Sequence, residues 1–259
     1  ERFPLMGWRG VIMGITLLII WRFYLNPHAE KEWSSLYTWQ GLIVIFAFSI
    51  NSIAFTLGIQ ETSVMVVLTA VATMPIFAAI LSSFMLREAQ GWVSWLTIIF
   101  AMIGVAIVVS DGNNAIGQPE GSTVLGAIYG AITAFGLALV FTMARKYPNL
   151  GVVPAAAIGA LFSGIIGFAL SAEGSVFNAP IWTVFTMGVV ILPVSFTCLS
   201  LAPRYTTSAT VSLVMLLEMV IGPFWVWFVI GEEPSIIMII GACLVIVFIA
   251  FHLIRTQFY

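Results

Sequence analysis

The chain has 259 residues, of which 61% are hydrophobic and only 8% are charged, and its mean hydropathy is +1.11. Soluble domains carry about 25% charged residues, so 9 Lys and Arg with 11 Asp and Glu residues are too few to solvate a globule of this length. The composition therefore excludes a soluble enzyme, a nucleic-acid-binding protein with a basic face and a disordered chain. We expect an all-α, polytopic membrane protein.

Nine apolar stretches are long enough to cross a membrane, because a bilayer core of about 30 Å needs about 20 apolar helical residues. In chain order, the predicted spans are Pro4–Leu25, Thr38–Leu57, Ser63–Leu86, Gly91–Ser110, Ser122–Met143, Val152–Ser171, Ile181–Leu201, Thr206–Ile230 and Ser235–Ile254. The polar breaks between them are short, so no separate soluble domain is expected.

The positions of Lys and Arg predict the orientation of these spans, since cytoplasmic loops accumulate basic residues. With Glu1 outside the cytoplasm, only Arg2 and Arg9 among the nine basic residues lie outside. The other seven, on the cytoplasmic side, are Arg22, Lys31, Arg87, Arg145, Lys146, Arg204 and Arg255. This bias predicts a cytoplasmic C-terminus, in a bacterial inner membrane or an organelle membrane.

The sequence also contains a weak internal repeat. A shift of 144 positions aligns Leu57–Thr62 with Leu201–Thr206, and the alignment continues without a gap to Glu88 and Glu232. A unit with an odd number of helices, duplicated in tandem, enters the membrane in opposite senses and gives inverted-topology repeats.

The repeat predicts how the chain is divided. The first copy covers residues 1–111 with four helices, an external linker covers 112–121, and the second copy covers 122–259 with five helices. The first copy therefore lacks an opening helix, either because that helix precedes Glu1 in a longer protein or because the protein is a nine-span variant.

Both copies have the same order of features: a short polar break, a long helix with a central proline (Pro75, Pro223), a Glu-bearing turn and a final Gly-containing helix. Short motifs in the first copy are Trp8-Arg9-Gly10, Gly58 to Thr62, Pro75, Arg87-Glu88 and Gly104-Val105, and those in the second copy are Leu217-Glu218, Gly222-Pro223, Gly231 to Pro234 and Gly241. In their order and spacing they resemble the EamA-type transporters of the drug/metabolite transporter (DMT) superfamily, whose members are two inverted five-helix repeats. Many relatives place proline directly after the mid-helix Glu, whereas this chain has Met219 there and Pro223 one turn later. The resemblance covers essentially the whole chain and implies transport without naming a substrate.

Glu218 is the sharpest candidate for a functional residue, because it lies near the middle of the span Thr206–Ile230 among apolar residues. A charge at that depth costs at least about 2.5 kcal/mol, so intramembrane acids usually face a cavity or a partner. Glu218 therefore either meets a substrate ammonium and takes a proton when substrate leaves, or is a protonated packing group between helices. Under the repeat its counterpart is Met74, so an acid site is expected in one copy only.

Further mid-span polar residues are candidates to share a cavity with Glu218. They are Ser49, Asn51, Ser52, Thr69, Thr73, Tyr129, Thr133 and Ser195, and Met215 and Trp225 lie one or two turns from Glu218 on its own face. We predict substrate binding by Glu218, Asn51, Ser52, Thr73, Tyr129, Thr133, Met215 and Trp225, and proton coupling by Glu218. The alternative for the Ser and Thr residues is helix-to-helix hydrogen bonding, and for Met215 and Trp225 it is packing against lipid or core.

Three classes of function can be compared with these sequence features. A secondary transporter that exports amino acids or similar amphipathic solutes by alternating access agrees best with an apolar lining and few buried cations. A channel or structural scaffold is the alternative, although no polar ring recurs along several helices. An intramembrane enzyme is disfavoured because no acidic pair or Ser/His arrangement shares one depth. We expect no cofactor and no metal, and as partners a small-molecule substrate, membrane lipid and a possible second copy in a homodimer, but no nucleic acid.

Overall fold

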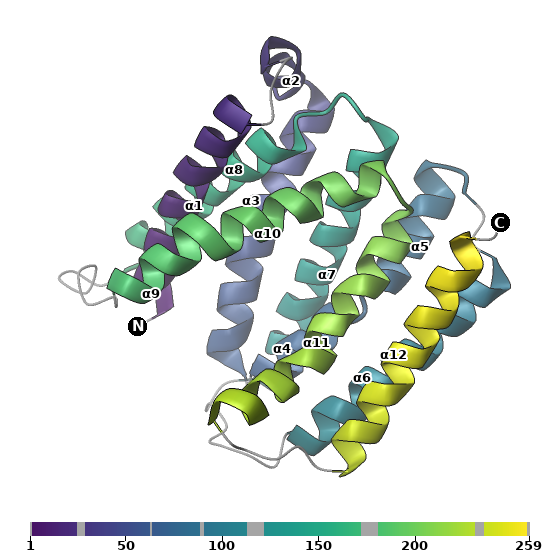
Figure 1. Ribbon diagram of the computed structural model, residues 1–259. Coiled ribbons are helices and arrows are strands. Elements are labelled where there is room, and N and C mark those ends of the chain that lie inside the picture. Colours follow the sequence, from purple (N-terminus) through teal and green to yellow (C-terminus); the bar gives the residue numbers. More distant parts are fainter. Residues whose placement is uncertain are drawn as a thin grey trace. The chain divides into compact units, whose positions relative to one another are not determined.

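The computed structural model describes residues 2–24, 29–62, 64–88, 91–112, 122–171, 181–230 and 236–257, and every regular element in these ranges is a helix. The helices are α1 (Arg2–Tyr24), α2 (Ala29–Ser35), α3 (Trp39–Glu61), α4 (Val64–Val71), α5 (Met74–Met85), α6 (Trp92–Gly112), α7 (Thr123–Lys146), α8 (Val152–Ala169), α9 (Ile181–Phe185), a π-helix η2 (Thr186–Ile191), α10 (Leu192–Leu201), a short 3₁₀ turn η3 (Ala202–Arg204), α11 (Ser208–Ile230) and α12 (Ile236–Gln257) (Figure 1).

The fold class predicted from composition is confirmed: the chain is an all-α, polytopic membrane protein. Helices in the described part that are long and apolar enough to cross a membrane are Phe3–Phe23, Trp39–Glu61, Val124–Lys146, Val152–Ala169 and Thr186–Arg204. Shorter apolar helices are Met74–Met85, Trp92–Gly104, Ser208–Glu218 and Ile239–Phe251. Lipid offers backbone groups no hydrogen bonds, so these apolar runs are stable only as helices.

One predicted span is wrong in its continuity. The stretch Ser63–Leu86 was expected to be a single helix, but α4 ends at Val71 and α5 begins at Met74. Pro75 occupies the first turn of α5, where its missing N–H and fixed φ are tolerated. The proline therefore starts a second helix and does not merely kink a continuous one.

The predicted span Ile181–Leu201 is helical throughout, but its middle is widened. Residues of η2 form a π-helix between α9 and α10, and the N–H of Leu192 donates to the carbonyl of Met187, five residues earlier. Pro193 follows at the start of α10. Because proline has no N–H to continue the α-helical pattern, the irregular turn lies where the sequence removes a donor.

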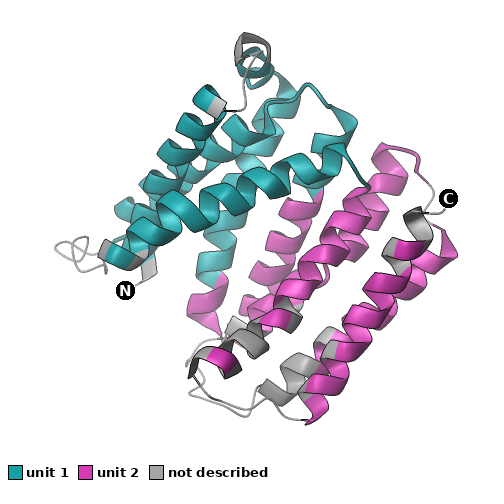
Figure 2. Cartoon of the chain, viewed as in Figure 1, with its two compact units in different colours: residues 1–57, 139–206 teal, residues 58–138, 207–259 magenta. Residues whose placement is uncertain are grey.

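The chain forms two compact units that alternate along the sequence. Unit 1 contains residues 1–57 and 139–206, and unit 2 contains residues 58–138 and 207–259 (Figure 2). Each unit therefore combines two segments that are separated in the chain by a segment of the other unit. The boundaries fall inside α3 and α7 and between η3 and α11.

Within unit 1, α1 packs antiparallel on α8 through small residues. A Cβ atom added to Gly167 would lie 2.7 Å from the backbone nitrogen of Gly7, and one added to Gly14 would lie 2.8 Å from the carbonyl oxygen of Ala157. The residue numbers of the contacting residues thus decrease along α8 as they increase along α1, so the two helices are antiparallel. Such close backbone approach is how helices associate without a hydrophobic driving force in lipid.

The small residues of α8 also pack against α3. A Cβ atom on Gly159 would lie 2.6 Å from the Cβ of Phe48, and the hydroxyl of Ser49 donates to the carbonyl oxygen of Gly159 over 3.2 Å. Ser49 is therefore a packing group, the alternative left open for such residues.

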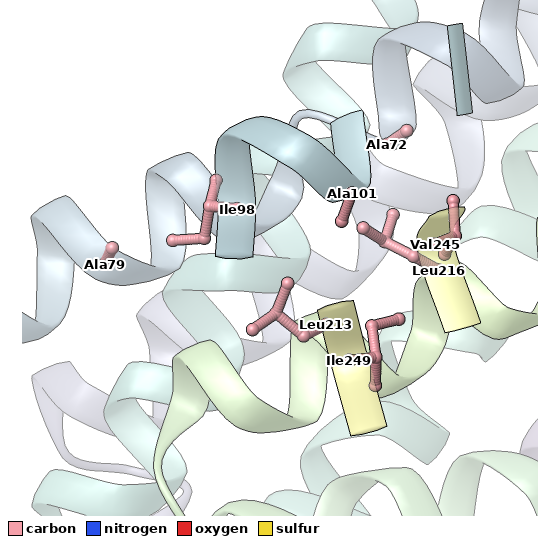
Figure 3. Close-up of a cluster of buried hydrophobic side chains, with 8 residues drawn as sticks. All are labelled: Ala72, Ala79, Ile98, Ala101, Leu213, Leu216, Val245 and Ile249. Atoms are coloured by element: carbon pink, nitrogen blue, oxygen red, sulfur yellow. The ribbon is translucent and has the colours of Figure 1, made fainter. Parts of the chain in front are cut away.

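Within unit 2, α6 and α12 pack antiparallel in the same manner. The rings of Phe100 and Phe248 stack with centroids 4.4 Å apart, and a Cβ atom on Gly104 would lie 2.8 Å from the carbonyl oxygen of Gly241. A buried cluster from α5, α6, α11, α12 and the end of α4 joins them. Its members are Ala72, Ala79, Ile98, Ala101, Leu213, Leu216, Val245 and Ile249 (Figure 3).

Unit 2 also holds the first part of α7 against α4 and α5. A Cβ atom on Gly130 would lie 2.6 Å from the Cβ of Ala70, and the rings of Phe135 and Phe77 meet edge to face at 5.8 Å. The residue numbers of the contacting residues increase together along both segments, so this part of α7 runs parallel to α4 and α5.

We expect Gly10→Ala to destabilise unit 1. The added methyl group would lie 2.6 Å from the carbonyl oxygen of Ala160 and 2.7 Å from the backbone nitrogen of Gly164, and rigid backbone cannot yield cheaply, so the expected loss is about 1–3 kcal/mol. The midpoint of thermal unfolding in detergent measures it. Gly91→Ala is the control, because no atom lies within 4 Å of its added Cβ. Equal midpoints for the two variants would contradict the close packing of α1 on α8.

Candidate functional site

Glu218 lies on the exposed face of α11 in unit 2. Leu213 and Leu216 on the opposite face are buried in the cluster of Figure 3, whereas Val214, Glu218 and Ile221 are exposed. The helical repeat places these three residues along one stripe. The carboxyl therefore projects from an apolar surface, away from the buried cluster.

The surroundings of the Glu218 carboxyl group show how it is held. Among the described residues, no hydrogen bond or ion pair to its carboxyl group is present. A carboxylate in contact with lipid alone is costly, and intramembrane acids face a water-filled cavity, a partner or a ligand. The described part of the chain thus provides no polar partner for this carboxyl.

Thr73 lies at the break between α4 and α5. Its hydroxyl donates to the carbonyl oxygen of Ala70 over 2.6 Å, and its N–H bonds to the same carbonyl oxygen. Because Pro75 has no N–H, the carbonyl of Val71 has no α-helical donor at that position. The junction therefore exposes backbone polarity within an apolar span, which membrane proteins tolerate only where protein or a cavity surrounds it.

Tyr129 and Thr133 lie on α7 within the same unit. The hydroxyl of Thr133 is buried and donates to the carbonyl oxygen of Tyr129. The contacts of α7 with α4 and α5 given above fall on either side of Thr133 and on either side of the Thr73 junction. The two threonines are thereby brought to the same level of unit 2, and Tyr129 lies beside Gly58.

Asn51 and Ser52 belong to unit 1, on α3. Asn51 is 8% exposed, and its Oδ1 atom is buried with no hydrogen-bond partner. Ser52 is half-buried, and its carbonyl oxygen accepts the hydroxyl hydrogen bond of Thr56. Since native proteins pair nearly all buried polar atoms, Asn51 is a candidate to meet a ligand.

The predicted site residues thus divide between the two units. Thr73, Tyr129, Thr133, half-buried Met215 and Glu218 lie in unit 2, and Asn51 and Ser52 lie in unit 1. Trp225 is part of α11, but its side chain lies outside the described residues, as does that of Thr69. In the part of the chain that the structure describes, no group of His, Cys, Asp or Glu side chains has the arrangement of a metal site.

A helical membrane chain with this arrangement matches a known family along its length. The model of the EamA-like transporter family matches residues 1–110 and 124–254. The chain belongs to the EamA-like transporter family. It is therefore a membrane transporter of the drug/metabolite kind and not an enzyme.

Two individual proteins are similar to this EamA-family chain. The uncharacterized transporter YdfC of Bacillus subtilis (strain 168) is 24% identical over 229 residues, which cover 83% of this chain and 71% of YdfC. A protein of known crystal structure matches 96% of this chain and 86% of its own chain with a TM-score of 0.76 at 13% identity. The second likeness concerns the fold alone.

Sequence reasoning missed three buried hydroxyl groups in the described part of this EamA-family chain. Thr197 on α10, Ser82 on α5 and Ser208 on α11 are buried, and their hydroxyl oxygens have no hydrogen-bond partner. The sequence favoured Ser195, which the structure leaves exposed. In an apolar span with little periodic contrast, no signal tells which helix face is turned inward.

The unpaired amide of Asn51 predicts a separable effect on stability. Asn51→Leu keeps a similar shape and removes a buried polar group without a partner, so it is expected to raise the free energy of unfolding by about 1 kcal/mol. Ser49→Ala, two residues earlier on α3, is expected to lower the free energy of unfolding, since it loses the hydroxyl bond to Gly159 of α8. Thermal midpoints of the purified protein in lipid nanodiscs measure both, and a loss of stability in Asn51→Leu would show that the amide is a packing group.

Proposed function

We propose that this chain is a secondary transporter that exports small amphipathic metabolites, amino acids first among them, by alternating access coupled to protons. The observation that carries the proposal is Glu218, a carboxyl without a described partner on an apolar, exposed stripe of α11. Export, the amino-acid class and proton coupling go beyond what family membership establishes.

A single carboxyl gives a simple means of coupling. When ionised, it attracts an ammonium group, and when substrate leaves, a proton neutralises it in a setting where an unpaired charge is costly. Substrate and proton then compete for one group. The apolar neighbours Val214 and Ile221 suit the hydrocarbon part of an amphipathic substrate.

The broken α4–α5 helix supports binding in unit 2. Discontinuous membrane helices in transporters commonly contribute backbone groups to substrate and ion sites. Here the junction at Thr73 and the neighbours of Glu218 contact one cluster, because Ala72 belongs to it and Leu217 packs against it. We propose that Thr73, Tyr129 and Thr133 line the substrate path in unit 2, and that Asn51 and Ser52 do so in unit 1.

The pairing of helices supports inverted repeats and thus alternating access. The shift of 144 positions that aligns Leu57 with Leu201 places α1 on α8 and α6 on α12. Both pairs are antiparallel, as a two-fold axis between repeats in opposite orientations requires. The same shift exchanges the contact of Phe100 with Phe248 for that of Gly104 with Leu244, and both contacts are present. We propose repeats over 1–111 and 122–259 on this basis, with the C-terminus in the cytoplasm.

Transport assays test the coupling role of Glu218. Purified protein in proteoliposomes is given a panel of radiolabelled amino acids, with and without an imposed pH gradient. We expect uphill movement of at least one of them in the wild type, and for Glu218→Gln a loss of the pH-driven component of at least tenfold, because the amide takes no proton. Glu61→Gln, at the end of α3, is the matched control and is expected to retain coupling.

Other outcomes of this assay separate the alternatives. Uphill transport that is indifferent to Glu218→Gln would make the carboxyl a packing group and direct attention to Asn51 and Tyr129. Flux that only dissipates gradients and does not saturate would support a channel.

Chemical labelling tests the same carboxyl without a known substrate. Dicyclohexylcarbodiimide is apolar and adds to protonated carboxyl groups, so it is expected to modify Glu218 from the lipid or cavity side. Labelling, located by mass spectrometry of peptides, is expected to fall as pH rises, because the reagent needs the protonated form. It is expected to vanish from this peptide in Glu218→Gln, and an unmodified wild-type peptide at every pH would contradict an accessible, protonatable Glu218.

A further inference from the structure

One end of unit 1 carries a polar network centred on Glu32 of α2. The indole N–H of Trp21, on α1, donates to Oε2 of Glu32 over 2.7 Å, and Nη2 of Arg204, in η3, lies 3.7 Å from Oε1. The indole ring of Trp21 also stacks on that of Trp33, with centroids 5.6 Å apart. A single carboxyl therefore links α1, α2 and η3.

The backbone of α2 holds a fourth segment, the turn between α7 and α8. The hydroxyl of Ser35 donates to the carbonyl oxygen of Glu32 over 2.6 Å and accepts the N–H of Gly151 over 3.0 Å. A Cβ atom on Gly151 would lie 2.8 Å from the carbonyl oxygen of Glu32. The turn is thus packed directly against α2.

Arg204 joins this turn to the segment that leads into α11. Its Nη2 atom donates to the carbonyl oxygen of Leu150 over 2.8 Å. Close by in the chain, Nη1 of Arg145 donates to the carbonyl oxygen of Thr206 over 2.7 Å. Residues 202–206 are therefore held to unit 1 by two guanidinium groups, immediately before the chain enters unit 2.

The pair between Glu32 and Arg204 is only partly engaged. A separation of 3.7 Å exceeds a charge-assisted hydrogen bond, which is about 2.7–2.9 Å long. The Nε atom of Arg204 is buried and has no partner, although a guanidinium can present two parallel donors to one carboxylate. Both side chains are about one-quarter exposed, at 22% and 24%, so water can replace either partner.

We propose that Glu32 and Arg204 form an ionic clasp that switches residues 202–206 and the turn 147–152 together between a state held to α2 and a released state. In the held state the guanidinium bridges Glu32 and Leu150, and α2 lies against both segments. On release the guanidinium turns to water and no longer joins the two segments, while the turn keeps the hydrogen bond of Gly151 to Ser35 and residues 202–206 keep that of Arg145 to Thr206. The clasp controls the freedom of the segment that precedes α11, the helix that carries Glu218, and it does not depend on which substrate the protein carries.

Hydrogen–deuterium exchange of the full chain in nanodiscs tests the clasp. Reporter amides are those of Leu150 and Val152 in the turn and of Tyr205 and Thr206 in the segment, each of which donates to a backbone carbonyl. In Glu32→Gln we expect exchange at both places to rise together by roughly tenfold, because the shared charge that closes the clasp is gone. Arg204→Gln also loses the hydrogen bond to Leu150, so it is expected to raise exchange at least as much, and the double variant is expected to add nothing beyond Arg204→Gln alone.

Controls and a second measurement keep the test decisive. Arg22→Gln removes an exposed cation from the last turn of α1 and is expected to change neither segment. If Glu32→Gln does not fold, wild-type protein in KCl raised from about 0.05 to about 1 M is measured instead, since salt screens a partly exposed pair, and both segments are expected to exchange faster in parallel. A rise in only one segment, additive effects in the double variant, or exchange that is insensitive to salt and to both substitutions would overturn the clasp.

Discussion

The hydrocarbon of lipid forms no hydrogen bonds with the protein, and this constraint explains why the described elements of the chain are helices. Backbone polarity is satisfied within helices, and helices associate where small residues let backbones touch, as Gly7 does with Gly167. Because lipid gives hydrophobic burial little driving force, close backbone approach at the glycines on α1, α6, α7 and α8 contributes to helix packing, and many large apolar residues lie exposed. Among the places where polarity is left over in the described part of the chain, Asn51, the Thr73 junction and Glu218 were the candidates for function that the sequence had named.

The fold was largely predictable because it follows from hydropathy and length. The predicted spans lie close to the observed helices, as when Val152–Ser171 became α8 (Val152–Ala169). The failure at Ser63–Leu86 has a clear physical cause. The residues there are apolar without interruption, so hydropathy averaged over the span does not show that Pro75 begins a new helix. The π-turn η2 was invisible for the same reason, since both helix types are equally apolar.

The site was predictable by residue type but not by arrangement. An acid in an apolar span is conspicuous in any sequence, which is why Glu218 could be named. The division of the candidate residues between two compact units could not be foreseen, because each unit joins two segments with a whole segment of the other unit between them in the chain. The sequence indicated Ser195 and missed Thr197. Tertiary contacts decide which face of α10 is buried, and the sequence does not show them. Local sequence thus supplies the polar groups, and only long-range packing decides which of them lack partners.

On the proposed register, Thr73, Met74 and Pro75 in one copy correspond to Leu217, Glu218 and Met219 in the other. Both triplets lie in unit 2, beside the buried cluster that includes Ala72 and Leu216. One copy introduces polarity by breaking its helix, which frees backbone groups without a charge. The other keeps its helix continuous, because no proline replaces Met219, and introduces polarity with a carboxyl. We propose that the backbone polarity at the broken helix and the carboxyl of Glu218 together favour a substrate that bears an ammonium and other polar groups. On this proposal, the asymmetry of the two triplets would give the substrate a single orientation.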